Sequence, residues 1–560
     1  MILSIQMKDL IRKYALQNAV KHEGKAVVGS VIGALMQEDP TLKVRIKDLS
    51  KNIVMIVNEV NSLSLEDQIK QLQELAPELL KEKVKEKRHG LKELSNSSDK
   101  MVFRFAPSPS GPMHVGHAIV LGLNYLYKQK YDGKLILRIE DTNPENIDPT
   151  AYTALETDGQ WITNNEINEI IVQSDRLQIY YDYCERLIAI GKAYVCKCSS
   201  EYFKKLVDQK IACPCREVPK QNQLVEWQRM FNETKQGSAV VRIKTDLNHK
   251  NPAMRDWPAM RINEQHHPRV NARVWPLMNL SVAIDDHEME VTHTIRAKEH
   301  MDNAKRQKYV LDYFGWNDPT HLFIGRINFE GMNLSTSQTR KLIEAGEYEG
   351  WQDIRLPFLG ALKRRGYQPE AFLKFVEELG ITQNDKTVTK EDFFKTLNYH
   401  NKQILEPVSD RYFFVQDPIK LLVKNAPSCD VEINLHPEFI ARGVRKFKTS
   451  DEFYISKKDQ IENNKLYRLM DCLNFKNGKF DSLEYENYKK TGEAIIHWLP
   501  VSDDLVKVSV RMPDNKLVYG FGESGLANLK EGSVIQFERF GFVRFDKRND
   551  DILEFWYAHN

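Results

Sequence analysis

The sequence has few cysteines and no long apolar run. Seven cysteines in 560 residues are too few for a secreted disulfide framework, and their odd number also argues against one. The best apolar candidate, residues 26–36, is short and is interrupted by Gly29 and Gly33, whereas a membrane-spanning helix needs about 18 apolar residues. Charges from Lys8 onward follow Met1 too closely for the apolar region of a signal peptide. We therefore expect a cytoplasmic protein with no membrane partner.

The sequence also has little net charge, no internal repeat and no low-complexity tract. The net charge of +2 says little about nucleic acid as a partner. Between Cys196 and Trp275, however, 15 Lys and Arg stand against 8 Asp and Glu, so any contact with a polyanion is expected in this segment. With 41% hydrophobic and 28% charged residues, the chain has the composition of a folded protein. Its length predicts several domains.

The first 80 residues have the apolar spacing of helices, at Leu10, Ile11, Tyr14 and Ala15. The charged run at 81–88, followed by Gly90 and the polar residues 95–98, predicts a charged helix end and a linker. We therefore predict a helical N-terminal extension over residues 1–95.

An α/β pattern follows this boundary. Residues 102–105 form a short apolar strand, a loop rich in Pro and Ser leads to a helix from Val115, and residues 135–139 form a second strand. Strand, loop, helix and strand make a βαβ unit.

The periodicity changes to two from about residue 410. Apolar and polar residues alternate from Val506 to Met512, a turn follows at 513–515, and further strands are predicted at 412–415 and 534–545. The C-terminal quarter is therefore predicted to be a β-barrel.

The loop between the first strand and its helix has the features of a phosphate-binding site. A helix N-terminus offers unpaired N–H groups at the carboxyl ends of parallel strands. His114 and His117 lie one turn apart there and could hydrogen-bond a pentavalent phosphate, while Gly116 lets an adenine approach the backbone. The alternative is an ordinary helix that begins with two exposed histidines. The pair alone would favour this alternative, but the strand-to-helix context favours a phosphate site.

Four of the seven cysteines form two close pairs. Cys196 and Cys198, then Cys213 and Cys215, could give tetrahedral thiolate coordination of zinc. One-residue spacers are less common in zinc sites than two-residue spacers, so four unligated cysteines remain the alternative.

Several segments resemble the glutamyl and glutaminyl group of class I aminoacyl-tRNA synthetases. Residues 107–117 are similar to the HIGH region of these enzymes, and residues 138–143 (Arg-Ile-Glu-Asp-Thr-Asn) match their next motif. The resemblance continues through four more segments, residues 274–276, 283–287, 364–367 and 435–437. It covers about residues 100–560, with motifs that are specific to the group.

The resemblance implies an α/β Rossmann-type catalytic domain in two parts, residues 96–195 and 276–345. An acceptor-stem-binding insertion at 196–275, a helical connector at 346–405 and a β-barrel anticodon-binding region at 406–560 complete the expected multidomain protein. Bacterial glutamyl enzymes have helices in the last region, whereas the β pattern resembles glutaminyl enzymes and the archaeal and eukaryotic glutamyl type. Of these, an archaeal-type enzyme fits best.

The same resemblance implies the site residues. The catalytic residues would be His114, His117, Ser335 and Ser337. The ATP-binding residues would be Pro107, Ser108, Pro109, Ser110, Gly111, Pro112, Met113, His114, Val115, Gly116 and His117, with Ser335, Thr336 and Ser337. Glutamate would contact Arg104, Ala106, Ser108, Glu140 and Arg296. For Glu140 the alternative is a surface salt bridge, and for Arg296 it is a structural salt bridge to Glu299 or Asp286.

The second phosphate loop of the class, KMSKS, corresponds to residues 332–341 but lacks the second lysine. Either Arg340 or Lys341 supplies the cation, or the loop acts through hydroxyl groups and backbone amides. A helix cap formed by Ser and Thr is the structural alternative.

The implied function is that of a glutamate–tRNA ligase. It would use ATP with Mg²⁺, L-glutamate and tRNA(Glu), with tRNA(Gln) left open as a second substrate, and it is expected to be a monomer. Bacterial glutamyl enzymes carry a zinc knuckle in the insertion, so a structural Zn²⁺ on Cys196, Cys198, Cys213 and Cys215 is the corresponding expectation. The competing interpretations are a glutaminyl-tRNA synthetase and a tRNA-binding protein that has lost amino-acid activation.

Overall fold

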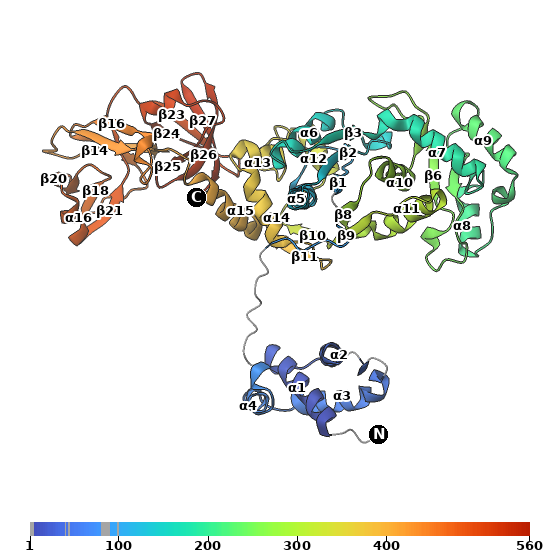
Figure 1. Ribbon diagram of the computed structural model, residues 1–560. Helices are drawn as coiled ribbons and strands as arrows, with labels where there is room; N and C mark the ends of the chain where they lie inside the picture. Colours follow the sequence, from blue (N-terminus) through green and yellow to red (C-terminus); the bar gives the residue numbers. More distant parts are fainter. Residues whose placement is uncertain (1–4, 40, 43–44, 80–89, 98–99) are drawn as a thin grey trace. The chain divides into compact units, whose positions relative to one another are not determined.

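The computed structural model describes residues 5–39, 41–42, 45–79, 90–97 and 100–560. The chain divides into two compact units, residues 1–89 and 90–560 (Figure 1). Of the predicted charged helix end and linker, residues 81–88 and 98 fall outside the described residues, whereas residues 90–97 are described and belong to the second unit. Within the described part of the chain, no helix combines the length and apolar character needed to cross a membrane.

The first unit is helical, as predicted. Its helices are α1 (Ile5–Lys21), α2 (Val28–Glu38), α3 (Ile46–Asn61) and α4 (Leu65–Leu75). Ile11 and Ala15 of α1 are fully buried in a core that also contains Leu35 and Ile53. The apolar spacing in α1 therefore marks the face that packs against the other helices.

The second unit begins with a five-stranded parallel sheet in the order β3-β2-β1-β8-β9. Its strands are β1 (Val102–Phe105), β2 (Lys134–Ile139), β3 (Glu169–Val172), β8 (His293–Ala297) and β9 (Thr320–Ile324). Helices α5 (Val115–Lys130) and α6 (Ala151–Ile162) follow β1 and β2. The strand order reverses between β1 and β8, and such a switch point opens a ligand crevice at the carboxyl ends of the strands. The predicted Rossmann-type domain is confirmed.

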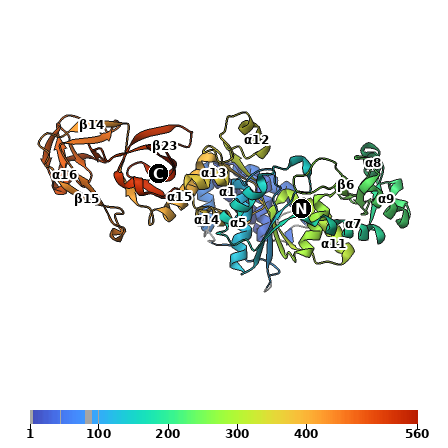
Figure 2. The same cartoon turned by 90° about the horizontal axis from the view of Figure 1, so that it is seen from above.

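An antiparallel sheet, β4-β5-β6-β7, lies in the chain between β3 and β8. Its segment contains α7 (Leu177–Ala189), β4 (Ala193–Cys196), α8 (Ser200–Asp208), α9 (Lys220–Asn232), β5 (Val240–Ile243), β6 (Pro258–Ile262), β7 (Val274–Pro276) and α10 (Met278–Glu288). Trp227 and Met260 are buried in its separate core. In Figure 2, α8 and α9 lie at the opposite end of the second unit from β14.

Helices connect the parallel sheet to the C-terminal strands. They are α12 (Thr336–Glu344), α13 (Leu359–Arg365), α14 (Pro369–Leu379) and α15 (Lys390–Leu405), with β10 (Ile327–Glu330) paired in parallel to β11 (Lys386–Thr389). Helix α11 (Met301–Phe314) comes earlier, between β8 and β9 of the sheet. Phe372 and Val376 of α14 pack into the core that contains Leu121 of α5. The connector therefore shares its core with the catalytic sheet.

The C-terminal region is built from strands, as predicted. A seven-stranded sheet has the order β12-β25-β26-β27-β23-β24-β13. Its strands are β12 (Arg411–Tyr412), β13 (Phe414–Gln416), β23 (Val506–Arg511), β24 (Leu517–Gly522), β25 (Val534–Phe537), β26 (Gly541–Asn549) and β27 (Ile552–His559). Because β12 and β13 are adjacent in the chain but lie at opposite edges of the sheet, it forms a nearly closed barrel.

The second group of strands contains β14 (Pro418–Leu422), β15 (Asp430–Asn434), β16 (Val444–Lys448), β17 (Glu452–Ser456), β18 (Leu466–Leu469), β19 (Asn474–Lys476), β20 (Lys479–Ser482), β21 (Gly492–Ile496) and β22 (Leu499–Pro500), with the short helix α16 (Tyr485–Thr491). The single strand predicted at 534–545 is wrong in one respect. It is two strands, β25 and β26, because Arg539 adopts a left-handed conformation with φ of 60° in the turn between them.

Candidate active site

A buried network of ion pairs lies at the carboxyl ends of the central strands. The guanidinium of Arg104, on β1, donates two hydrogen bonds to the carboxylate of Asp286, at 3.0 and 3.1 Å. Arg138, on β2, donates to Asp286 at 2.7 Å and to Glu140 at 3.1 Å. Burial alone would raise the pKa of Asp286, but Arg104 and Arg138 hold that pKa well below its usual range. Asp286 is therefore ionised and fully used by two partners.

Glu140 and Arg296 also line this crevice, and each has fewer hydrogen-bond partners than Asp286. Burial raises the pKa of Glu140, against the opposing effects of Arg138 and Arg104. Arg296, on β8, is only 6% exposed, and its Nη1 donates to Oε1 of Gln307 at 2.9 Å. No carboxylate of the described residues lies within ion-pair distance of it, so the alternative salt bridges to Glu299 and Asp286 are not formed.

The surroundings of Arg296 are electropositive. The pKa of Arg296 is lowered to about 9, first by burial and second by the positive charge of nearby Arg104. Burial and the positive charges of Arg296 and Arg104 lower the pKa of His300 to about 4. Arg296 therefore remains charged at pH 7 beside a neutral histidine. An anionic group is the ligand that this buried cation would bind most favourably.

The phosphate loop places its two histidines at the start of α5. His114 is the N-cap, and its Nδ1 accepts hydrogen bonds from the backbone N–H groups of Gly116 at 3.1 Å and His117 at 3.4 Å. Nδ1 of His117 accepts in turn from the N–H of His114 at 3.4 Å. The rings stack with their centroids 3.8 Å apart. The two histidines thus cap the helix, and both are partly buried rather than exposed.

Both histidines are neutral, with a defined tautomer. Burial lowers the pKa of His117 to about 4, and burial together with His117 lowers the pKa of His114 well below its usual value. In a neutral imidazole one ring nitrogen accepts and the other donates. Because Nδ1 accepts in both rings, Nε2 carries the proton, and neither Nε2–H has a hydrogen-bond partner among the described residues. Both rings therefore keep a donor for a ligand.

The second loop lies against the first. Ser335 is the N-cap of α12 and accepts from the N–H of Gln338 at 3.3 Å, and Thr336 and Ser337 begin that helix. Arg340 donates to the carbonyl of Ser110 at 2.7 Å and to Asp148 at 3.2 Å. A Cβ on Gly111 would approach Thr336 Cγ2 to 3.1 Å. The two loops predicted to bind ATP are thus in direct contact, and the helix cap considered as the alternative is present.

The remaining predicted residues are also located. Ala106 and Ser108 lie on the loop after β1. Ala106 is partly exposed, and Ser108 is exposed between buried Pro107 and Pro109. The backbone N–H of Glu140 donates to the carbonyl of Pro107 at 2.9 Å. The loop therefore passes over the end of β2, where Glu140 stands.

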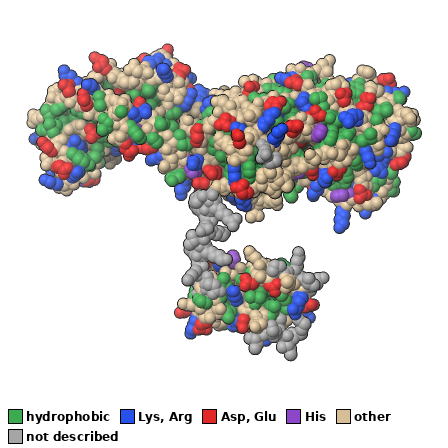
Figure 3. Space-filling model, in the orientation of Figure 1, with side chains coloured by type: hydrophobic (Ala, Val, Ile, Leu, Met, Phe, Trp, Pro, Cys, Tyr) green, Lys and Arg blue, Asp and Glu red, His purple; other side chains and the backbone are tan. Residues whose placement is uncertain are grey.

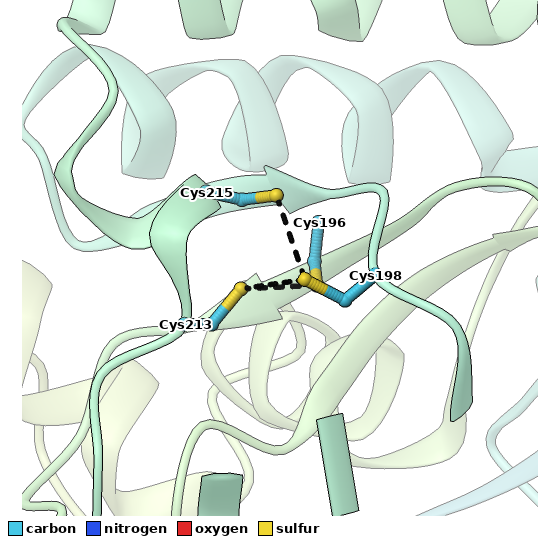
Figure 4. A group of neighbouring side chains, drawn as sticks. All are labelled: Cys196, Cys198, Cys213 and Cys215. Carbon is cyan, nitrogen blue, oxygen red and sulfur yellow. Dashed lines mark hydrogen bonds between the residues drawn. The ribbon is translucent and has the colours of Figure 1, made fainter. Parts of the chain in front are cut away.

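The four cysteines form a separate group in the insertion. Cys196 ends β4, Cys198 follows it, and Cys213 and Cys215 lie at the short helical turn Pro214–Glu217. Their sulfur atoms point toward one another (Figure 4), and all lie within 4.8 Å. Sulfur–sulfur distances are 3.5 Å for 196–213, 3.2 Å for 198–213 and 3.9 Å for 198–215.

A cavity of about 560 Å³ lies where the insertion meets α10 and α11. Lys204, Arg242 and Arg306 line it, and none has a carboxylate partner among the described residues. The guanidinium of Arg242 stacks on Phe203, with Cζ 3.3 Å from the ring centroid. Asn279, also in the lining, accepts from Gln307 at 3.4 Å. The cavity is therefore cationic and adjoins Arg296 through Gln307. Lys and Arg side chains are numerous on the surface of the insertion (Figure 3).

Four residues of the site were not given a role by the sequence. They are Arg138, Asp285, Asp286 and Gln307. Asp285 accepts from Gln173 at 2.7 Å, Tyr180 at 2.8 Å and Arg176 at 2.9 Å. Arg138, Asp285 and Asp286 belong to segments that carry the family resemblance, which was the available signal. No local pattern marks Gln307.

Comparisons with known proteins agree with this geometry. The family described as "tRNA synthetases class I (E and Q), catalytic domain" matches residues 100–406. Two families described as anti-codon binding domains of the same synthetases match residues 409–497 and 495–546.

Similar proteins extend over the whole chain. The glutamate–tRNA ligase of Pyrococcus furiosus is 43% identical over 99% of this chain and 100% of its own length. That of Thermococcus kodakarensis is 44% identical over the same shares. A crystal structure of a glutamate tRNA ligase from Elizabethkingia meningosepticum, in complex with its amino acid, has a TM-score of 0.39 and 18% identity over 55% of this chain and 70% of that chain. From the matched catalytic and anticodon-binding domains and these full-length relatives, the chain belongs to the glutamyl and glutaminyl family of class I aminoacyl-tRNA synthetases.

Proposed function

We propose that this chain is a glutamate–tRNA ligase that activates L-glutamate with ATP and transfers it to the 3′ end of tRNA(Glu). The observation that supports glutamate is Arg296, a buried guanidinium with no carboxylate partner among the described residues, beside Glu140. In the crevice, the guanidiniums of Arg104, Arg138, Arg176 and Arg296 face the carboxylates of Glu140, Asp285 and Asp286. One cation is left over, which suits a substrate with one net negative charge.

The reaction takes place in two displacements. A carboxylate oxygen of glutamate attacks the α-phosphorus of Mg²⁺-bound ATP, and the bond to the β-phosphate bridging oxygen breaks to release pyrophosphate. A ribose hydroxyl of the terminal tRNA nucleotide then attacks the carbonyl of the adenylate and AMP leaves. Neither step needs a protein nucleophile, so positioning and charge stabilisation carry the catalysis. The Nε2–H groups of His114 and His117 would donate to the phosphates in the first step.

The glutamate would lie across the carboxyl ends of β1, β2 and β8. Glu140 would accept from the ammonium group and Arg296 would bind the side-chain carboxylate. Arg104 and Arg138 both donate to Asp286, and these bonds would fix the crevice. Nη1 of Arg104 has no hydrogen-bond partner among the described residues and would remain for glutamate, together with contacts from the loop at Ala106 and Ser108. In the second loop, Arg340 is bound to Ser110 and Asp148. We therefore assign the missing cation to Lys341, with Ser335, Thr336 and Ser337 placing the helix N-terminus at the phosphates.

Amino-acid-dependent exchange of pyrophosphate into ATP tests this function. It is measured with glutamate and with glutamine, each with and without tRNA. We expect exchange with glutamate and none with glutamine. Exchange that prefers glutamine would indicate a glutaminyl-tRNA synthetase. Absence of exchange under every condition, with tRNA binding intact, would indicate a tRNA-binding protein.

The tRNA would contact both ends of the second unit. The insertion at 196–275 is the basic segment and would bind the acceptor stem, since phosphate contacts by Lys and Arg dominate such affinity. The cationic cavity beside Asn279 would receive the 3′ end close to Arg296. Residues 406–560 would bind the anticodon, and the connector at 346–405 joins them to the catalytic parts at 96–195 and 276–345. Charging assays on purified tRNA(Glu) and tRNA(Gln) decide whether both are substrates.

The cysteine group fits one structural Zn²⁺. Four thiolates at the usual Zn–S distance of about 2.3 Å in a tetrahedron stand about 3.8 Å apart. Three of the sulfur pairs are 3.2, 3.5 and 3.9 Å apart, and all four sulfur atoms lie within 4.8 Å of one another. The N–H of Lys197 donates to Sγ of Cys215 at 3.4 Å, a contact that orients a metal-binding thiolate. Since protein would supply all four ligands, a zinc ion here would stabilise the insertion and take no part in the chemistry.

The zinc assignment predicts about one zinc per chain in protein purified under reducing conditions without chelators. Cys198→Ser should lose that zinc and weaken tRNA charging more than glutamate-dependent exchange, because only charging depends on the insertion. Cys429→Ser, which changes a cysteine outside the group, is the control and should keep both. Metal analysis that finds no zinc in the wild-type protein would favour the alternative of four unligated cysteines.

The N-terminal unit is predicted to be dispensable for the chemistry. Residues just after it belong to the second unit: the N–H of Leu94 donates to the hydroxyl of Tyr131 at 2.7 Å, and the ring of His293 contacts the carbonyl of Ser95 at 2.9 Å. A chain that begins at Gly90 keeps these contacts and should show exchange close to the full chain, with at most weaker tRNA binding. A folded chain of this length without exchange would place part of the active site in residues 1–89.

A further inference from the structure

The phosphate loop is bound from outside by one short segment. The N–H of Leu359 donates to the carbonyl of Met113 at 2.8 Å, and the N–H of Val115 donates to the carbonyl of Pro357 at 3.2 Å. Between these two hydrogen bonds, His114 and Phe358 form an antiparallel β-bridge. The ring of Phe358 is fully buried and lies edge-on to His114, with 6.1 Å between centroids. The backbone of His114 therefore moves with residues 357–359.

Helix α13 begins directly after this bridge. It contains Leu359–Arg365, and its seven residues extend roughly 10 Å. Leu359, Ala361 and Leu362 are fully buried, so the helix is packed along its length and no flexible segment separates the bridge from its far end. A displacement of one end is thus passed to the other.

The far end of α13 is bound to the C-terminal barrel. Arg364 donates to both carboxylate oxygens of Asp546, on β26, at 2.7 and 2.6 Å. Its guanidinium lies over Trp556 of β27, with Cζ 3.9 Å from the ring centroid. Arg365 donates to the backbone carbonyls of Tyr557 at 3.3 Å and Ala558 at 2.9 Å.

These contacts are largely shielded from solvent. The side chain of Asp546 is 5% exposed and Arg365 is 6% exposed. Two-pronged Arg–carboxylate pairs fix orientation as well as distance, and arginine–carbonyl hydrogen bonds add a second point of attachment. The end of the helix therefore has one position relative to β26 and β27.

We infer that Arg364, Arg365 and Asp546 are positioning residues for amino-acid activation, because barrel docking on α13 sets where His114 stands in the phosphate site. The inference rests on the proposed function. A shift of about 1 Å in a catalytic group is enough to slow a reaction by roughly 100-fold. A residue of the anticodon-binding region thereby affects a step that involves ATP and glutamate alone.

The test is Asp546→Asn in the full chain, measured by glutamate-dependent pyrophosphate exchange with tRNA present. The amide has one acceptor oxygen in place of two, so it cannot form the forked pair with Arg364, and it brings an N–H group against the guanidinium. We expect kcat to fall about tenfold while KM for glutamate stays within about twofold, since the glutamate contacts do not involve α13. Arg364→Lys, which keeps the charge but loses the fork, should lower kcat to an intermediate value.

A matched control separates this effect from general loosening of the barrel. Arg411→Gln breaks the ion pair of Arg411 with Glu406, 2.5 Å long, which joins the barrel to the end of α15 without touching α13. Its kcat should match the wild type. Equal losses of kcat in Arg411→Gln and Asp546→Asn would overturn the inference, as would an unchanged kcat in Asp546→Asn.

The remaining outcomes are also assigned. If Asp546→Asn unfolds below the assay temperature, Arg364→Lys decides, because it keeps the ion pair: a wild-type kcat in Arg364→Lys together with a wild-type melting temperature contradicts the inference. Absence of glutamate-dependent exchange in the wild-type chain would count against the proposed function and not against the role of α13. The kcat values of the same variants would then be compared in glutamine-dependent exchange.

Discussion

Replacing His117 by alanine is expected to slow glutamate-dependent pyrophosphate exchange by roughly 100-fold or more. Its Nε2–H is a preorganised neutral donor at the proposed phosphate site, and removal of one such donor typically costs about 3 kcal/mol of transition-state stabilisation. The affinity for tRNA should remain close to that of the wild type, because the ring lies in the ATP loop. Stopped-flow or quench-flow measurement of adenylate formation, together with a tRNA-binding assay, checks both parts.

His114 needs a different substitution, because its ring also caps α5. His114→Ala removes the cap as well as the donor, and loss of a cap alone costs about 1 kcal/mol of stability. His114→Asn keeps an acceptor for the N–H groups of Gly116 and His117 but removes Nε2–H. Exchange in His114→Asn should therefore fall as far as in His117→Ala, with less loss of thermal stability than His114→Ala. Wild-type exchange rates in His114→Asn and His117→Ala would remove both residues from the reaction.

Replacing Arg296 by alanine is expected to raise the KM for glutamate by about 100-fold or more and to reduce the preference for glutamate over glutamine. Leaving a buried charge without its partner costs about 3–5 kcal/mol, and in the variant that charge is the side-chain carboxylate of glutamate. Glutamine, which brings an NH₂ group to a side chain that can only donate, should lose much less. The KM for ATP should change little. Exchange kinetics with each substrate varied in turn measure all three constants.

Two further variants sharpen this assignment. Gln307→Glu places a carboxylate at the atom that now accepts from Arg296 at 2.9 Å, so it should compete with glutamate and raise its KM while Arg296 itself is intact. Lys298→Ala removes a cation that lies two positions further along the chain and is paired with Asp385. It should leave the KM values for glutamate and glutamine unchanged. If Arg296→Ala discriminates between glutamate and glutamine as well as Lys298→Ala does, specificity lies elsewhere in the crevice.

Local features of the site could be predicted from the sequence. The strand at 102–105, the helix from Val115 and the placement of His114 and His117 one turn apart follow from spacing alone, since hydrogen-bonding and apolar patterns within about 30 residues determine a βαβ unit. The barrel strand at 506–511 follows from alternation. The turn at Arg539 was missed because both flanking segments are apolar, although Gly541, with φ of 132°, was an available signal of the reversal.

The pairing within the site could not be predicted, because it depends on which strands become neighbours. Asp286 binds Arg104 and Arg138, which precede it by 182 and 148 residues. The sequence indicated Arg104 as a glutamate contact, which stays a prediction, but it gave no sign that Nε and Nη2 of Arg104 donate to Asp286. Likewise, Arg340 and Lys341 are equivalent in sequence, and only the contacts of Arg340 with Ser110 and Asp148 distinguish them.

The position of the insertion between β3 and β8 has a consequence for synthesis of the chain on the ribosome. The N–H of Val102, at the start of β1, donates to the hydroxyl of Thr292, which immediately precedes β8, across 190 residues of sequence. At about 5–20 residues per second, β1 waits roughly 10–40 s for this neighbour, although β2 and β3 are already available on its other side. During that interval one edge of a buried parallel strand is unpaired, and such edges are sites of aggregation. Early folding of the insertion, with its own core around Trp227, would bring its two ends together and shorten the search of β8 for β1.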